Sequence, residues 1–159
     1  MTIAALYRKF KAVDTDKIIE ETMTECADAL NSQNLEQLFD GKTKEGTNIT
    51  PSYLQDPYFK TPEAAKKYSN WKDQITPSDK RSPGTPNLYI NGRYHRSRRI
   101  TVTAGSITHS ATDPAAAKIE SKFKDIDGLG GEYKTEFLKQ SVQPLLKQKI
   151  QTATGLIMK

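Results

Sequence analysis

The chain has 159 residues, of which 35% are hydrophobic and 27% are charged, and its formal net charge at pH 7 is +5. This length predicts a single domain over residues 1–159, and the low apolar share predicts a modest core that neighbours complete. The single cysteine, Cys26, excludes an internal disulfide and a CxxC metal site, and no apolar run is long enough to span a bilayer. Because apolar residues precede the basic ones at the N-terminus, the reverse of a signal peptide, we expect synthesis in the cytoplasm.

Helical patterns occupy the first 40 residues. Residues 1–13 have a short amphipathic pattern that we expect to dock on the sheet or on a partner. Asp14 or Thr15 suits a helix N-cap, and apolar residues at helical spacing then predict a helix over 15–31, with Cys26 as a small buried thiol. A second, shorter helix is predicted over 34–39. The apolar members of the first pattern are Ile3, Leu6, Tyr7, Phe10 and Val13.

Residues 42–60 predict a long surface loop, because the segment is rich in Gly, Pro, Thr and Asn. A short strand is expected near Ile49. A loop of this length in a compact domain is functional or is ordered by a partner. Its aromatic residues, Tyr53, Tyr58 and Phe59, either pin the loop to the core or anchor a protein interface.

Thr61-Pro62-Glu63 predicts a helix start, with an N-cap, a proline at the first helical position and an acid in the first turn. The helix is expected to continue to about Asp73, and Trp71 is expected to lie in the core. The segment 76–87 contains three prolines and a glycine, which predicts an irregular connector.

The strongest strand signals follow this connector. Residues 88–90 are apolar and β-prone, and Asn91-Gly92 is the pair most typical of a tight hairpin turn, so we expect a strand, a turn and a return arm over 93–96. Apolar and polar residues then alternate over 99–103 and again over 107–110. This alternation predicts an antiparallel pair with one buried face.

Four arginines gather beside this hairpin: Arg93, Arg96, Arg98 and Arg99. They would bind phosphate or an acidic protein surface. The alternative is a solvated hairpin whose charges discourage edge pairing. In either case we expect their replacement by serine to leave stability nearly unchanged, because exposed charges contribute little.

The C-terminal third is again helical. A short helix over 115–123 follows Asp113-Pro114, and DIDGLGG at 125–131 predicts a turn. It does not match a calcium loop, because position five is a leucine and the glycine falls early. A closing helix is predicted over 133–152, kinked or divided by Pro144, followed by an apolar tail at 156–158.

Together these patterns predict an α+β fold with a small antiparallel sheet at about 88–110, packed by N-terminal and C-terminal helices. No histidine has a neighbour at catalytic or ligand spacing, and no glycine run matches a nucleotide loop. We therefore expect no enzyme, no cofactor and no metal site. The residues expected to be buried are Leu30, Trp71, Ile100, Val102, Phe123, Phe137 and Leu145.

This order of parts resembles the tail-completion and head–tail connector proteins of tailed bacteriophages, which have an opening helix, a hairpin-rich sheet and a closing helix. Residues 88–123, LYINGRYHRSRRITVTAGSITHSATDPAAAKIESKF, are similar to the family's strand, turn, strand and helix segment. Residues 137–150, FLKQSVQPLLKQKI, are similar to its closing helix. The resemblance covers about residues 85–150.

The resemblance implies a non-enzymatic subunit of a homo-oligomeric neck or tail-completion ring, which contacts portal, tail or neck subunits and joins head to tail. Ring subunits meet by head-to-tail contacts that must close, and a thin core, a long loop and apolar chain ends suit such a subunit. The expected location is the virion, after synthesis in the cytoplasm of the bacterial host. The alternative is a basic nucleic-acid-binding module that contacts DNA through the arginines at 93–99.

Overall fold

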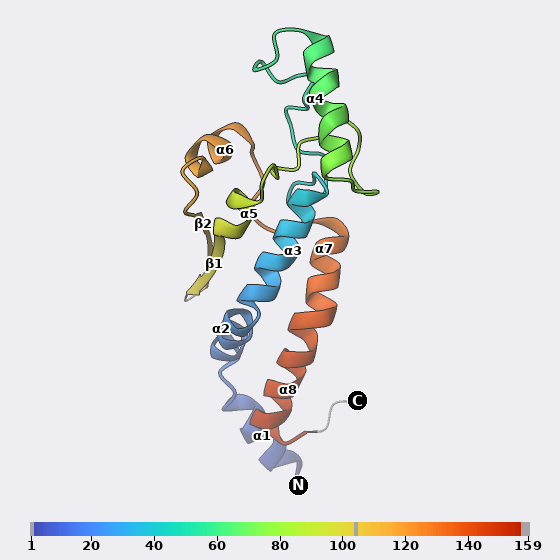
Figure 1. Cartoon of the computed structure of the whole chain (residues 1–159). Coiled ribbons are helices and arrows are strands. Elements are labelled where there is room, and N and C mark those ends of the chain that lie inside the picture. The colour runs from blue at the N-terminus through green and yellow to red at the C-terminus, as the bar shows by residue number, and fades with distance from the viewer. Residues whose placement is uncertain (1, 104, 157–159) are drawn as a thin grey trace.

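The chain has an α+β fold in which helices pack against a two-stranded antiparallel sheet, seen in a computed structural model that describes residues 2–103 and 105–156 (Figure 1). The predicted turn residue Ala104 and the tail residues Ile157 and Met158 lie outside the described residues. Within the described ranges, no helix is both long enough and apolar enough to cross a membrane.

Three helices open the chain: α1 (Ile3–Lys11), α2 (Thr15–Glu25) and α3 (Ala27–Phe39). Asp14 caps α2 as predicted, with its Oδ1 accepting a hydrogen bond from the Lys17 amide at 3.0 Å. The predicted break near residue 32 is wrong, because the chain turns at Cys26 and α3 then runs without interruption.

The fourth helix, α4 (Pro62–Ile75), starts as predicted, with Thr61 as its N-cap. The expectation that Trp71 lies in the core is wrong, because 43% of its surface is exposed. The buried face of α4 is rotated by about one residue from the predicted aromatic stripe and is largely polar. Its buried members are Ala65, Ser69 and Lys72.

The predicted first strand at 88–90 and its Asn91-Gly92 hairpin are also wrong. Gly92 has a positive φ of 74°, but the chain continues from it into the short helix α5 (Arg93–Ser97). The Asn91 side chain supports this start, since its Oδ1 accepts a hydrogen bond from the Arg93 amide at 3.1 Å. A glycine with positive φ serves a helix entry as readily as a hairpin turn.

The second predicted hairpin is confirmed. Strands β1 (Arg98–Thr103) and β2 (Ser106–Ala111) are antiparallel, with Ile100 opposite His109 and Val102 opposite Ile107. The sheet therefore has two strands in the described chain and covers 98–111 rather than 88–110.

The C-terminal helices follow the predicted order: α6 (Ala116–Lys122), α7 (Gly131–Phe137) and α8 (Gln143–Thr154). A π-helical turn, Leu138–Val142, joins α7 to α8, and Pro144 stands in the first turn of α8. Because proline lacks the N–H that the preceding turn needs, a change of helical pitch just before it is the expected division.

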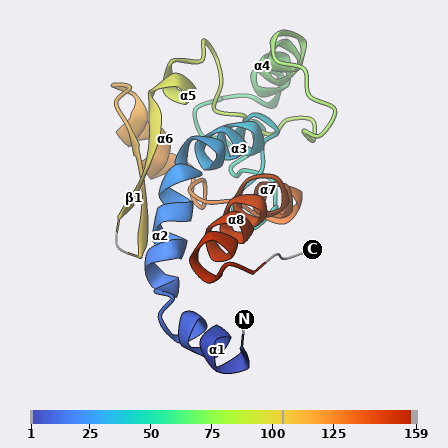
Figure 2. The same cartoon turned by 90° about the horizontal axis from the view of Figure 1, so that it is seen from below.

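Figure 2 shows α2 and α3 lying between the sheet on one side and α7 and α8 on the other. One apolar cluster, around Cys26, Leu30 and Phe137, includes Ile100 of β1 and connects these layers. A second joins α3 to the loop and to α6. Its buried members are Leu38, Ile49, Phe123 and Ile126.

Burial matches the prediction in part. Leu30, Phe123 and Phe137 are buried, whereas the side chains on the sheet and on α8 are half-buried. Those half-buried residues are Ile100, Val102 and Leu145. Many fully buried side chains are polar, so the core depends on hydrogen bonds more than the apolar patterns suggest.

Candidate functional site

The four arginines predicted as one exposed patch are divided by the fold. Arg93, Arg96 and Arg99 are exposed, and Arg93 forms an ion pair with Asp113 at 3.5 Å. Arg98 is wrong as a member of the patch, because only 1% of its surface is exposed. It begins β1, where alternation turns its side chain toward α3 while the side chain of Arg99 faces solvent.

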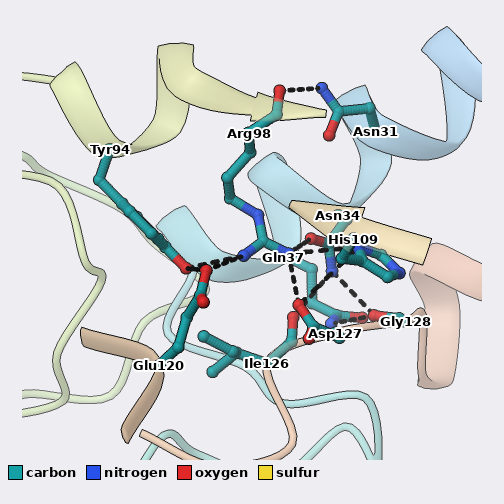
Figure 3. Close-up of polar contacts among 10 residues, drawn as sticks. All are labelled: Asn31, Asn34, Gln37, Tyr94, Arg98, His109, Glu120, Ile126, Asp127 and Gly128. Atoms are coloured by element: carbon teal, nitrogen blue, oxygen red, sulfur yellow. Dashed lines mark hydrogen bonds and ion pairs between the residues drawn. The ribbon is translucent and has the colours of Figure 1, made fainter. Parts of the chain in front are cut away.

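Arg98 is the centre of a buried polar network that joins β1, α3, α5 and the turn after α6 (Figure 3). Its Nη1 donates to Tyr94 Oη at 2.7 Å, and its Nη2 donates to Asn34 Oδ1 at 2.9 Å and to Asp127 Oδ1 at 2.7 Å. A guanidinium presents five N–H donors in a rigid plane, which suits it to tie several elements together.

The same network binds the predicted turn at 125–131 through two amide side chains of α3. Asn34 Nδ2 donates to the carbonyl oxygens of Ile126 and Gly128 at 3.1 and 2.9 Å. Gln37 donates to the Gly128 carbonyl and accepts from the Gly130 amide at 2.8 Å. Sequence reasoning missed this role, because the partners are more than 90 positions apart.

Both histidines belong to this polar region. Burial lowers the pKa of His95 to about 4, and its Nε2 lies 3.1 Å from the Asn87 carbonyl oxygen. Burial also lowers the pKa of His109, whose Nδ1 lies 3.3 Å from Arg98 Nη2 and 3.8 Å from Asp127 Oδ1. Because arginine only donates, the His109 Nδ1 accepts here.

The network is arranged to hold elements together. Burial raises the pKa of Tyr94 to about 12, so its hydroxyl stays protonated and donates to Glu120 at 3.2 Å while accepting from Arg98. The oxygens of Asn34 and Asp127 also accept from the guanidinium. Apart from the Arg98 Nε, which is buried without a partner among the described residues, these groups satisfy one another, and such a set is best suited to a structural role.

The aromatic residues of the long loop have different positions. Tyr53 is buried and packs edge-on against Tyr68 of α4, with ring centroids 5.0 Å apart, so it pins the loop to the core. Phe59 is half-buried, 5.1 Å from Tyr68. Tyr58 lies at the rim beside Phe59 with 78% of its surface exposed, and it remains an interface candidate.

A pocket of about 400 Å³ lies beneath these rings. It is lined by the loop residues Tyr53, Asp56, Tyr58 and Phe59, by Tyr68 and Lys72 of α4, by residues 86–90, and by Ile119, Lys122 and Phe123 in or just after α6. Sequence reasoning did not find Lys72, because an isolated lysine on a helix is usually exposed.

A second candidate surface is the apolar side of α1. No residue of this helix is buried, and three of its large apolar side chains are exposed. Ile3 is 87% exposed. Tyr7 and Phe10 are also exposed. In Figure 1 the helix lies at one end of the molecule, beside the end of α8.

Across residues 2–103 and 105–156, no three His, Cys, Asp or Glu side chains are placed to hold a metal ion together. Comparisons with protein-family models, with curated proteins and with solved structures gave no match to this chain.

Proposed function

We propose that the chain is a non-enzymatic structural subunit of a tailed-phage virion, one copy of a neck or tail-completion ring that joins head and tail. The observation that supports it most is the exposed apolar side of α1. A nine-residue helix is marginal by itself in water. Burial of Ile3, Tyr7 and Phe10 against a neighbour would stabilise it by roughly 25 cal/mol for each Å² covered.

A groove elsewhere on the same chain has apolar and acidic side chains that match the apolar and basic side chains of α1. It lies between α2 and the β1–β2 hairpin, has a volume of about 490 Å³, and includes the exposed apolar side chains of Ile19 and Ile107. Asp16 and Glu20 line it with negative charge. The helix α1 carries three basic residues in its last turn: Arg8, Lys9 and Lys11.

Apolar match and opposite charge therefore support a contact between α1 of one copy and this groove of the next. Such a contact uses two different surfaces, and repeated head-to-tail contacts close into a ring when the rotation allows it. This is the type of interface that a neck subunit would use.

Cysteine trapping tests the contact between copies. We expect a Lys11→Cys chain mixed with a Ser106→Cys chain to form a mixed disulfide dimer on mild oxidation, because the first residue ends α1 and the second lines the groove. Replacing Ser106→Cys by Ser52→Cys, on the distant loop, is the matched control. The native Cys26 is buried, so we expect it not to form disulfides that would interfere with the measurement.

Equal yields in the two mixtures would contradict the α1–groove contact. Mass spectrometry and cryo-electron microscopy of purified virions test the location itself. We expect the protein in mature particles, at the joint between head and tail. Its absence from those particles would refute the structural role.

The alternative, a nucleic-acid-binding module, depends on three exposed arginines: Arg93, Arg96 and Arg99. A gel-shift titration with duplex DNA at low salt tests it against a variant with serine at all three. If the patch binds DNA, the affinity of the unmodified chain for DNA falls steeply as the salt concentration rises, and the serine variant binds DNA much more weakly at low salt. No binding by the unmodified chain at low salt would exclude this alternative.

A further inference from the structure

The pocket beneath the aromatic rings has an apolar wall and one unusual charge. Its lining includes the aromatic side chains of Tyr53, Phe59, Tyr68, Tyr89 and Phe123, together with the ion pair of Asp56 and Lys122. Aromatic pockets of this size with a few fixed polar groups are typical binding sites.

The unusual charge is Lys72, which lines the pocket and is only 1% exposed. Its ammonium donates to the Tyr89 carbonyl oxygen, which is its one hydrogen bond among the described residues. An ammonium has three N–H donors, so two are left for a further acceptor. Burial, and to a lesser extent the nearby Arg81, lowers the pKa of Lys72 to about 8.

The other cations near this pocket already have carboxylates. Lys122 forms an ion pair with Asp56, and Arg81 forms one with Asp73 at 3.0 Å. Lys72 forms no ion pair within the described chain. A buried charge without a counter-charge is costly, and an incoming carboxylate would remove that cost.

We propose that this pocket binds an acidic segment of a partner protein, which places a Glu or Asp carboxylate on Lys72 and a neighbouring large apolar side chain against the aromatic rings. The inference rests on the pocket alone and does not depend on the place proposed for the chain in the virion.

Two observations favour a polypeptide of this kind as the occupant. Two of the residues that line the pocket, Tyr58 and Ile90, are largely exposed to solvent, so a ligand that covers them extends out of the cavity. The basic helix α1 of another copy does not fit, because its Arg8, Lys9 and Lys11 would meet the positive charge of Lys72. The partner segment is therefore acidic.

Titration with a matched pair of peptides tests the proposal. The probes are acetyl-Gly-Phe-Glu-Leu-Gly-amide and the same peptide with Gln in place of Glu, and binding is followed by amide chemical shifts at pH 7. A carboxylate on a buried ammonium gains more than a neutral amide does, so we expect about tenfold tighter binding of the Glu peptide. The shifts should centre on Tyr68, Lys72 and Tyr89.

Two variants make the test specific. Lys72→Met keeps the length of the side chain and removes its charge, so the two peptides should bind it equally. Tyr58→Ser, at the exposed rim, leaves the fold intact, and it should weaken both peptides while keeping their ratio. Equal binding of the two peptides to the unmodified chain, or shifts confined to another surface, would overturn the proposal.

A small-molecule arm addresses the size of the ligand. We expect 4-phenylbutyrate, which has the same carboxylate and ring, to bind more weakly than the Glu peptide, because it leaves Tyr58 and Ile90 uncovered. Binding of 4-phenylbutyrate with equal or greater affinity would overturn the assignment to a partner segment. Failure of the cysteine trapping described above would leave this result unaffected.

Discussion

Replacement of Arg98 by methionine removes the centre of the buried network while keeping a long apolar side chain. The loss is unequal among its partners. Asn34 Oδ1 is fully buried and loses a charged donor at 2.9 Å, which costs about 1–3 kcal/mol. The Tyr94 hydroxyl still donates a hydrogen bond to Glu120 at 3.2 Å, so it keeps one partner in the variant.

The remaining contributions are smaller and partly cancel. The Asp127 side chain is 54% exposed and regains water, so its lost ion pair contributes about 0–1 kcal/mol. The Arg98 Nε is buried without a partner, and its removal offsets part of the loss. We therefore expect a destabilisation of about 1–3 kcal/mol, or a melting temperature lower by about 2–12 °C for a domain of this size.

Urea unfolding followed by circular dichroism measures this change, with Arg96→Met as the matched control. Arg96 is exposed and makes no hydrogen bond through its side chain among the described contacts, so its replacement should stay within about 0.5 kcal/mol. If the two variants unfold at the same urea concentration, the network does not stabilise the fold and the reasoning fails.

The effect of acid on stability tests the burial of His95. Its pKa is about 4 in the fold and 6.5 ordinarily, so the unfolded chain binds a proton at a higher pH than the folded chain does. The free energy of unfolding should fall by up to about 3 kcal/mol as pH drops from 6.5 to 4, and His95→Gln should flatten that slope in urea titrations. The pKa of Lys72 is about 8 in the fold and 10.5 ordinarily, so between pH 8 and 10.5 the unfolded chain keeps a proton that the folded chain has lost. The free energy of unfolding, relative to that of Lys72→Met, should therefore rise by about 3 kcal/mol across this pH range. If the free energies of the two chains change in parallel with pH, the prediction is refuted. Gly130→Ala should destabilise strongly, because its Cβ would meet the Lys44 carbonyl oxygen, and a melting curve like that of the unmodified chain would contradict the packing.

Local signals in the sequence were enough for most helix starts and for one hairpin. Asp14 and Thr61 cap their helices, and the alternation at 99–103 and 107–110 gives the observed strands. These features depend on residues within a few positions of one another, which a single sequence shows directly.

The candidate sites depend on contacts that the sequence does not show. Arg98 looks like its neighbours in an exposed run, and only the placement of Asn34 and Asp127 distinguishes it. Trp71 looked like a core residue, yet the buried face of α4 is the adjacent one, on which Ser69 and Lys72 lie. Lys72 bonds to a carbonyl oxygen 17 positions later, and no periodic pattern indicates such a pairing.

The hydrogen bonds of Asn34 have a consequence for synthesis on the ribosome. Its two acceptors, the carbonyl oxygens of Ile126 and Gly128, are made 92 and 94 residues later. At a translation rate of roughly 5–20 residues per second, α3 is exposed for about 5–20 s before those acceptors exist. During that interval the N-terminal helices cannot form their native contacts with the C-terminal part of the chain. The domain therefore folds only after most of the chain has been synthesised.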